Sequence, residues 1–272
     1  MAIRKAIIPE TVFSRLKNIK SAPVLSEDKA STRTKKEGSS LSSSPVSSQR
    51  SQIIVGVDEA GRGPVLGPMV MAALAFKEEE IQKLAWLGVK DSKQLSSEVR
   101  EDLFERLREV VHDFRVEVIE PDAIDLSLSE SNLNWLEADT SSRMVSELAP
   151  DKAIIDCPSV NIESYKKYFH DKIPPPLHDS IVLVVEHKAD VNHLVVSAAS
   201  IVAKVMRDRW IDRLKREIGI DFGSGYTSDP KTQRFLAAHH DKFPGLFRTR
   251  WQSYKRIEEA KRQKSLGDFE GK

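Results

Sequence analysis

Four acidic residues beside buried-looking segments are the side chains of this chain best suited to do chemistry. One pair directly follows an apolar run, a third residue ends another run, and the fourth lies between an apolar strand and a long helical stretch. These residues are Asp58, Glu59, Asp156 and Asp190. In an open α/β sheet the strand ends form the crevice in which ligands bind. We therefore expect the four carboxylates to meet in one crevice.

Carboxylates gathered in this way predict a metal site. Four of them would repel each other at neutral pH, and divalent cations relieve such repulsion. Hard oxygen ligands favour magnesium or manganese over zinc. Two ions about 3.5–4 Å apart can hold both the attacking water and the leaving oxygen of a phosphodiester. The pattern thus predicts two Mg²⁺ or Mn²⁺ ions that serve in-line hydrolysis without a protein nucleophile.

Each carboxylate also has a purely structural interpretation. An isolated Asp at a helix start, such as Asp190, is usually an N-cap. A lone Asp after a strand, such as Asp156, is usually a turn residue. The spacing of the residues leaves these alternatives open.

Composition fits a folded protein without disulfides. The 272 residues, 40% hydrophobic and 31% charged, permit one large domain with extensions or two small domains. The only cysteine, Cys157, excludes an internal disulfide and a cysteine-based zinc site. No apolar run approaches the roughly 20 residues that a membrane helix needs. We expect a protein in a reducing compartment, with no membrane partner.

Charge is distributed unevenly along the chain. Residues 1–50 contain ten basic and four acidic residues, whereas residues 51–272 contain 32 and 37. A nucleic-acid ligand would therefore bind a local basic surface. Residues 1–20 suit a short amphipathic helix, and the serine-rich segment 21–52 predicts a disordered linker. A transit peptide is the alternative for this basic start.

Strands alternating with helices predict a three-layer α/β domain. The second strand follows the first too closely for a crossover helix, so that pair is antiparallel and the sheet is mixed. Expected strands are 53–57, 65–76, 116–119, 153–156 and 181–185. Expected helices are 96–111 with caps at Ser96 and Ser97, 130–148, 160–169, a stretch from Asp190 to about 217, 229–241 and 247–263.

Four segments, in order, resemble the type 2 ribonuclease H family. They are Val57-Asp58-Glu59-Ala60-Gly61-Arg62-Gly63-Pro64, then 89–95 (Val-Lys-Asp-Ser-Lys-Gln-Leu), then 186–190 (Glu-His-Lys-Ala-Asp) with 196–205, and 223–226 (Gly-Ser-Gly-Tyr) with 229–232. The resemblance covers about residues 52–256. It implies a ribonuclease H-like core at 52–222, a substrate-sensing and helical C-terminal part at 223–272, and an extension at 1–51.

The resemblance also implies roles for individual residues. Asp58, Glu59, Asp156 and Asp190 would be the catalytic metal ligands. Gly61, Arg62 and Gly63 would bring backbone groups to a ribose 2′-hydroxyl, the only handle that separates ribose from deoxyribose. Tyr226 would sense the junction between a ribonucleotide and a deoxyribonucleotide. A plain tight turn and a packed tyrosine are the respective alternatives.

Several basic and polar residues are candidate phosphate contacts. They are Lys90, Ser92, Lys93, Lys204, Arg207 and Lys231. Such contacts position a duplex and carry no sequence information. Residues 248–264, around Trp251 and Tyr254, add a basic helix suited to touch duplex DNA. A solvated surface charge is the alternative for each of these residues.

Taken together, the resemblance implies a metal-dependent endoribonuclease. It would cut the RNA strand of RNA/DNA hybrids, and duplex DNA on the 5′ side of an embedded ribonucleotide, leaving 3′-hydroxyl and 5′-phosphate ends. Expected partners are these duplexes, with accessory subunits or a replication clamp. The expected location is the cytoplasm, or the nucleus if the source is eukaryotic, with organellar targeting by the first 50 residues as an alternative.

Three other functions compete with this one. A non-catalytic duplex-binding subunit would lack at least one metal carboxylate. A type 3 ribonuclease H would carry an additional N-terminal domain, of which residues 1–50 show no sign. A nucleotidyl transferase with a similar carboxylate cluster would not need the ribose-sensing residues.

Overall fold

The computed structural model describes residues 50–270 of the chain. The predicted helix at 1–20 and nearly all of the predicted linker lie outside the described residues. Ser51–Lys272 form one compact unit, so the division expected at residue 222 stays a prediction. No helix among the described residues combines the length and apolarity that crossing a membrane requires.

A mixed sheet of five strands forms the middle of this unit. The strands lie in the order β3-β2-β1-β4-β5. They are β1 (Ile53–Ala60), β2 (Met69–Lys77), β3 (Asp113–Ile119), β4 (Lys152–Asp156) and β5 (Val182–Glu186). β1 pairs antiparallel with β2 and parallel with β4, which confirms the prediction of a mixed sheet.

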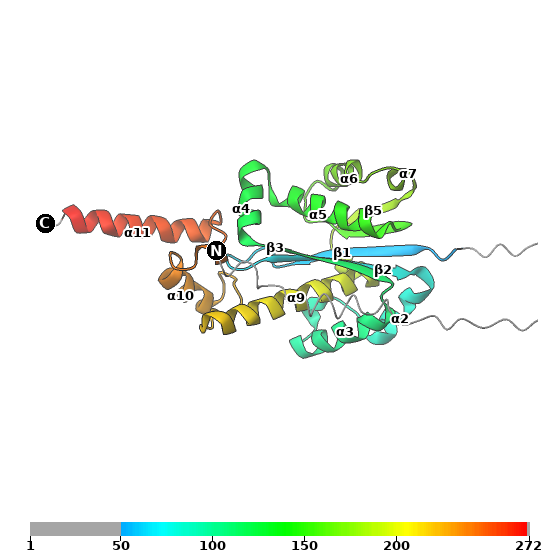
Figure 1. Ribbon diagram of the computed structural model, residues 1–272, viewed down its shortest axis with the longest axis horizontal. Helices are drawn as coiled ribbons and strands as arrows, with labels where there is room; N and C mark the ends of the chain where they lie inside the picture. Colours follow the sequence, from blue (N-terminus) through cyan, green and yellow to red (C-terminus); the bar gives the residue numbers. More distant parts are fainter. Residues whose placement is uncertain (1–49, 271–272) are drawn as a thin grey trace, which may run out of the picture. The chain divides into compact units, whose positions relative to one another are not determined.

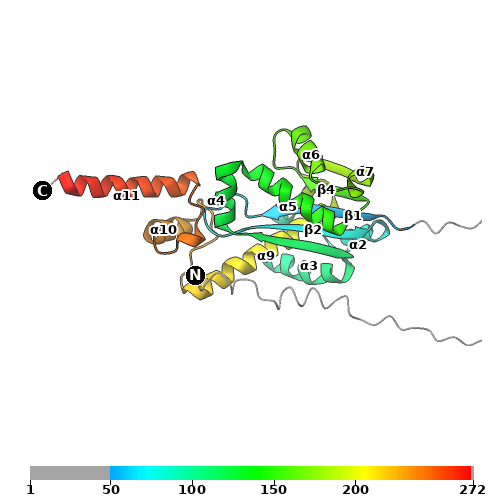
Figure 2. The same cartoon turned by 45° about the horizontal axis from the view of Figure 1, so that its top comes forward.

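Helices cover both faces of the sheet and make the three predicted layers (Figure 1). On one face lie α2 (Ile81–Leu87), α3 (Ser97–Val110) and α9 (Leu194–Ile218). On the other lie α4 (Pro121–Glu130), α5 (Leu133–Leu148), α6 (Ile162–Asp171) and α7 (Leu177–Ser180). The short α8 (Ala189–Asn192) precedes α9, and α10 (Pro230–His239) and α11 (Gln252–Glu270) follow it. In the turned view of Figure 2, α4, α5 and α6 still lie above the sheet, and α9 and α3 lie below it.

The strand β2 lies inside the sheet, between β3 and β1, and its sequence is continuously apolar. All residues from Met69 to Phe76 are buried, because both faces of the sheet are covered. Alternate side chains enter different clusters. Val70, Ala72, Leu74 and Phe76 join the cluster with α9, whereas Met69, Met71, Ala73 and Ala75 join the cluster with α5. The strand begins four residues later than predicted, since 65–68 complete a turn.

Two predicted helices are each divided in the structure. The stretch 130–148 contains the end of α4 and all of α5, because Asn132 accepts a hydrogen bond from the backbone N–H of Trp135 and caps a new helix. The stretch after Asp190 is interrupted at His193, where the backbone is extended. Ser96 caps α3 as predicted, by accepting from the backbone N–H of Val99.

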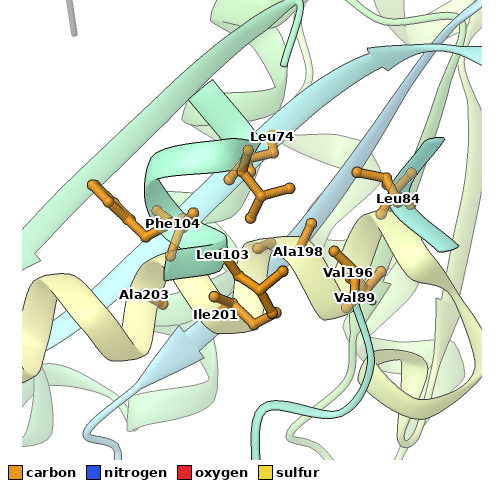
Figure 3. Packing of buried hydrophobic residues seen from close by; sticks show 14 of the residues in the cluster. Leu74, Leu84, Val89, Leu103, Phe104, Val196, Ala198, Ile201 and Ala203 are labelled. Atoms are coloured by element: carbon orange, nitrogen blue, oxygen red, sulfur yellow. The ribbon is translucent and has the colours of Figure 1, made fainter. Parts of the chain in front are cut away.

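Close packing between α9 and β1 positions the first carboxylate. Small side chains on α9, such as Ala198, pack with Leu103 and Leu74 in the cluster shown in Figure 3. Gly56 makes the approach possible, since a Cβ there would lie only 2.3 Å from the carbonyl carbon of Val195. α9 therefore runs directly against the strand that carries Asp58.

Candidate active site

The four predicted carboxylates line one cavity of about 270 Å³. Asp58 lies near the end of β1, and Asp156 ends the parallel neighbour β4. Asp190 lies in α8, just after β5. Because the carboxyl ends of parallel strands share one edge, the sheet brings these residues together from distant parts of the sequence.

Asp58 is a buried carboxylate that faces α9. Its Oδ1 accepts a hydrogen bond from the backbone N–H of Glu59 at 2.8 Å, and the Ser200 hydroxyl also supports it. Burial raises the pKa of Asp58 well above its usual value, and repulsion from Glu59 and Asp156 adds to the effect. Burial beside two other carboxylates therefore makes the ionised form of Asp58 costly.

Glu59 leaves β1 on the opposite face, as neighbouring strand residues must. Burial raises its pKa, while the nearby Arg62 guanidinium opposes that rise. Asp156 accepts a hydrogen bond from the backbone N–H of Ala189 at 2.7 Å. Burial also raises the pKa of Asp156, with repulsion from Asp190 contributing.

Asp190 contacts a cation of the chain itself. It is 2% exposed, and its Oδ2 lies 2.9 Å from the Lys93 ammonium group. The N-cap residues of α8 and α9 are Lys188 and His193, so the alternative of Asp190 as an N-cap is wrong. Lys93 is thus the ion-pair partner that the structure shows for this carboxylate among the described residues.

The donor chemistry of this cavity fits hard divalent cations. All four acidic groups offer oxygen, and neither His nor Cys lines the cavity. Among the described residues, no three His, Cys, Asp or Glu side chains already converge as a finished metal site. Asp58 and Glu59 both line the cavity, although they are neighbours on β1. The raised pKa values of the two carboxyls show that their charges are costly without a cation beside them.

The backbone of the turn Gly61-Arg62-Gly63 is held through its carbonyl groups. Arg248 donates to the carbonyl oxygens of Gly61 at 2.5 Å and Arg62 at 2.8 Å, and the Trp251 indole N–H donates to that of Gly63 at 3.2 Å. None of the three backbone amides donates to another described residue. The turn thus leaves three N–H groups for a ligand at the rim of the cavity.

Arg207, a predicted phosphate contact, is a buried side chain that holds backbone carbonyl groups. The side chain is 1% exposed and donates to the carbonyl oxygens of Pro68, Leu66 and Ser224. Its guanidinium carbon lies 5.4 Å from the centre of the Tyr226 ring. Arg207 therefore supports the tyrosine from its buried side, at the wall of a cavity of about 430 Å³ that both residues line.

The other predicted contacts divide into three groups. Ser92, Lys93 and Lys204 line the carboxylate cavity, although the Ser92 hydroxyl is buried 2.9 Å from that of Ser200. Lys231 lines an adjacent cavity of about 430 Å³ and pairs with Asp221. Lys90 is exposed and lines neither cavity. Tyr226, 36% exposed, borders both cavities.

Two site residues escaped the sequence analysis. Arg248 belongs to a run that we predicted to be a solvated or DNA-binding face, yet it is fully buried. Burial lowers the pKa of Arg248 to about 9, and the Arg207 charge adds to the lowering. Glu137, on α5, is likewise buried and pairs with Arg62. The local sequence does not indicate that either residue is buried, because charged residues are mostly exposed.

Comparison with known proteins places the chain in a family. The family model for ribonuclease HII matches residues 55–254. The ribonuclease HII of Pyrococcus furiosus is 39% identical over 210 residues, which are 76% of this chain and 92% of that protein.

Solved structures agree with this relationship. The ribonuclease HII in the PCNA complex from Archaeoglobus fulgidus is 36% identical, with a TM-score of 0.67 over 75% of this chain and 96% of that one. Bst-RNase HIII in complex with Mn²⁺ is 25% identical, with a TM-score of 0.65 over 77% of this chain and 70% of that one. The four carboxylates and the turn beside them therefore lie in the ribonuclease H fold that the first resemblance implied. The chain belongs to the ribonuclease HII family and is a ribonuclease H enzyme.

Proposed function

We propose that this ribonuclease H hydrolyses RNA strands in RNA/DNA hybrids and also cuts duplex DNA on the 5′ side of an embedded ribonucleotide. The observation that carries the proposal is one cavity in which four carboxylates lie beside a turn with three available backbone amides. The acidic side chains serve the phosphodiester, and the turn serves the neighbouring ribose.

Asp58, Glu59, Asp156 and Asp190 would hold two divalent ions, Mg²⁺ or Mn²⁺. When bound, such ions activate water and neutralise charge on the phosphate. The chain's own residues orient the duplex around them. Lys93 and Lys204 line the cavity at positions suited to bind phosphate oxygens. No side chain has to act as a nucleophile.

The turn and Tyr226 would together contact the ribose. A 2′-hydroxyl can accept a hydrogen bond from a backbone amide of Gly61, Arg62 or Gly63. An ideal Cβ at Gly63 would lie 3.7 Å from the Tyr226 ring, so the tyrosine faces the turn directly. A sugar between them would contact the amides on one side and the aromatic ring on the other.

Cleavage is expected to depend completely on a divalent metal. The purified chain should cut a continuous RNA/DNA hybrid and a DNA duplex with one ribonucleotide in Mg²⁺ or Mn²⁺, because repelling carboxylates need cations to bind phosphate. Excess chelator should stop both reactions, and added Mg²⁺ should restore them. Undiminished cleavage in chelator would contradict the proposal.

The competing functions account for less of this site. If the chain were a non-catalytic subunit, the four carboxylates that line the cavity would have no function. A nucleotidyl transferase gives no role to the turn or to Tyr226. The match to the ribonuclease HII model over 200 residues favours type 2 over type 3.

We also propose a replication clamp as a protein partner. The supporting observation is the similar ribonuclease HII of Archaeoglobus fulgidus, whose solved structure is a complex with PCNA. The full chain should bind a PCNA-type clamp with a Kd below about 10 μM by calorimetry, within the range of transient complexes. No detectable heat at ten times that concentration would remove the clamp from the proposal. Accessory subunits stay a prediction.

A further inference from the structure

Glu137 is a buried carboxylate for which the proposed hydrolysis has no use. It lies on α5 with 1% of its side chain exposed. Burial raises the pKa of Glu137 well above its usual value, and repulsion from Glu59 adds to this, whereas Arg62 opposes it. Apolar residues of similar size often pack at such positions with no loss of stability. The acidic group therefore calls for a reason beyond packing.

Its contacts point to the arginine of the ribose-sensing turn. Glu137 Oε2 accepts a hydrogen bond from Arg62 Nη1, and Arg62 Nη2 donates to Asn134 Oδ1 at 2.7 Å. Asn134 and Glu137 are three residues apart and so share one face of α5. The guanidinium is thus held at two points, and one third of the Arg62 side chain remains exposed.

Arg62 is the middle residue of the turn, so fixing its side chain also restrains the backbone. Arg248 holds the carbonyl group of Arg62, while α5 holds the guanidinium. The same guanidinium lies near enough to Glu59 to lower the pKa of that carboxyl. One side chain therefore joins the carboxylate cavity, the turn and α5.

We propose that Glu137 is a positioning residue: together with Asn134 it fixes Arg62, and so aligns the Gly61–Gly63 amides for the ribose and keeps a positive charge beside Glu59. This inference rests on the proposed function, because it assigns those amides to substrate. A purely structural ion pair is the competing explanation. It would affect folding without selective effects on ribonucleotide recognition.

A double-mutant cycle separates the two explanations. Glu137→Ala, Arg62→Ala and the double variant are assayed for kcat and KM on a duplex with one ribonucleotide and on a continuous hybrid. If Glu137 acts through Arg62, each single variant loses about 30-fold in kcat/KM on the single-ribonucleotide duplex and the double variant loses no more. The loss on the continuous hybrid should be smaller, since several riboses there contribute to binding.

Conservative and control variants sharpen the test. Glu137→Gln still accepts a hydrogen bond from the guanidinium and should stay within about threefold of the starting activity. Glu147→Ala removes an exposed carboxylate from the same helix. The ion pair that it breaks is with Arg115 on β3, not with a residue of the turn. It should leave both activities unchanged. Thermal unfolding of every variant establishes that it is folded.

The outcomes that overturn the inference are distinct from failure of the proposed function. Folded Glu137→Ala with nearly full activity, losses that multiply in the double variant, or Glu137→Gln as impaired as Glu137→Ala would each overturn it. If Glu137→Ala does not fold, Asn134→Ala replaces it in the cycle, with about a fivefold loss expected. Absence of cutting by the unchanged enzyme would instead reject the proposed function.

Discussion

Asp58→Asn is expected to abolish cleavage and, at the same time, to stabilise the metal-free protein. Loss of one metal-binding carboxylate should lower kcat by at least about 10³-fold, because metal ions supply several kcal/mol of stabilisation to such transition states. Single-turnover cleavage of the hybrid measures this loss. Asn keeps the shape of Asp58 but carries no charge in its buried position beside Glu59 and Asp156.

The stability gain has a defined dependence on pH. The folded state raises the pKa of Asp58 above its usual value of 3.8, so the ionised carboxylate destabilises the fold at neutral pH. When the pH falls through the raised pKa of folded Asp58 toward 3.8, the buried carboxyl becomes protonated and the unchanged protein loses this cost. Asp58→Asn should therefore have the higher Tm in chelator at pH 7, and its advantage should shrink as the pH falls.

Metal should reverse the order of stability. Mg²⁺ binds only the folded state, so it should raise the Tm of the unchanged protein more than that of Asp58→Asn. Asp102→Asn, the same change on the surface of α3, serves as the control and should alter neither Tm nor kcat. A metal-free Asp58→Asn protein less stable than the unchanged protein at pH 7 would contradict this account of the cavity.

Arg248→Ala is expected to cause the largest loss of stability among single changes in this site. The guanidinium is buried and donates to the carbonyl oxygens of Gly61, Arg62 and Gly67, none of which the alanine variant could satisfy. Three lost charge-assisted hydrogen bonds predict a decrease of about 3–5 kcal/mol in the free energy of unfolding. Denaturant unfolding in metal-free buffer measures it.

Activity should fall with stability, because the turn loses the contacts that hold its carbonyl groups. Arg248→Lys provides a second test, since one ammonium group cannot reach all three carbonyls and should recover only part of the loss. Arg250→Ala, two residues away and exposed, is the matched control and should change stability by less than about 0.5 kcal/mol. An Arg248→Ala protein as stable as Arg250→Ala would show that the turn is held by other contacts.

Strands, caps and strand-end carboxylates could be predicted from the sequence, because each depends on neighbouring residues. The burial of charged side chains could not, because it depends on the whole fold. Apolar runs indicated all five strands, and a short connection indicated the antiparallel pair β1–β2. Asp58 and Asp156 were predicted to meet because β1 and β4 end at the same edge. Ser96 was recognisable as a cap because a cap needs only the next three residues.

Arg207, Arg248 and Glu137 could not be recognised in this way. Each is a charged residue in a polar or helical stretch, where exposure is the ordinary expectation. Most of their partners are distant in the sequence: Glu137 and its partner Arg62 are 75 residues apart, Arg207 and Pro68 are 139 apart, and Arg248 and Gly61 are 187 apart. The orientation of Asp58 and Glu59 toward opposite faces of β1 follows from strand geometry alone.

The most direct test of the central claim is to map the cut in a DNA duplex that carries one ribonucleotide. Labelled strands, Mg²⁺ and the full chain are sufficient, with the all-DNA duplex run in parallel. We expect one cut on the 5′ side of the ribonucleotide, with 3′-hydroxyl and 5′-phosphate ends, and no cut in the all-DNA duplex. A cut on the 3′ side with a cyclic phosphate end would contradict it, because the 2′-hydroxyl, rather than water, would then be the nucleophile.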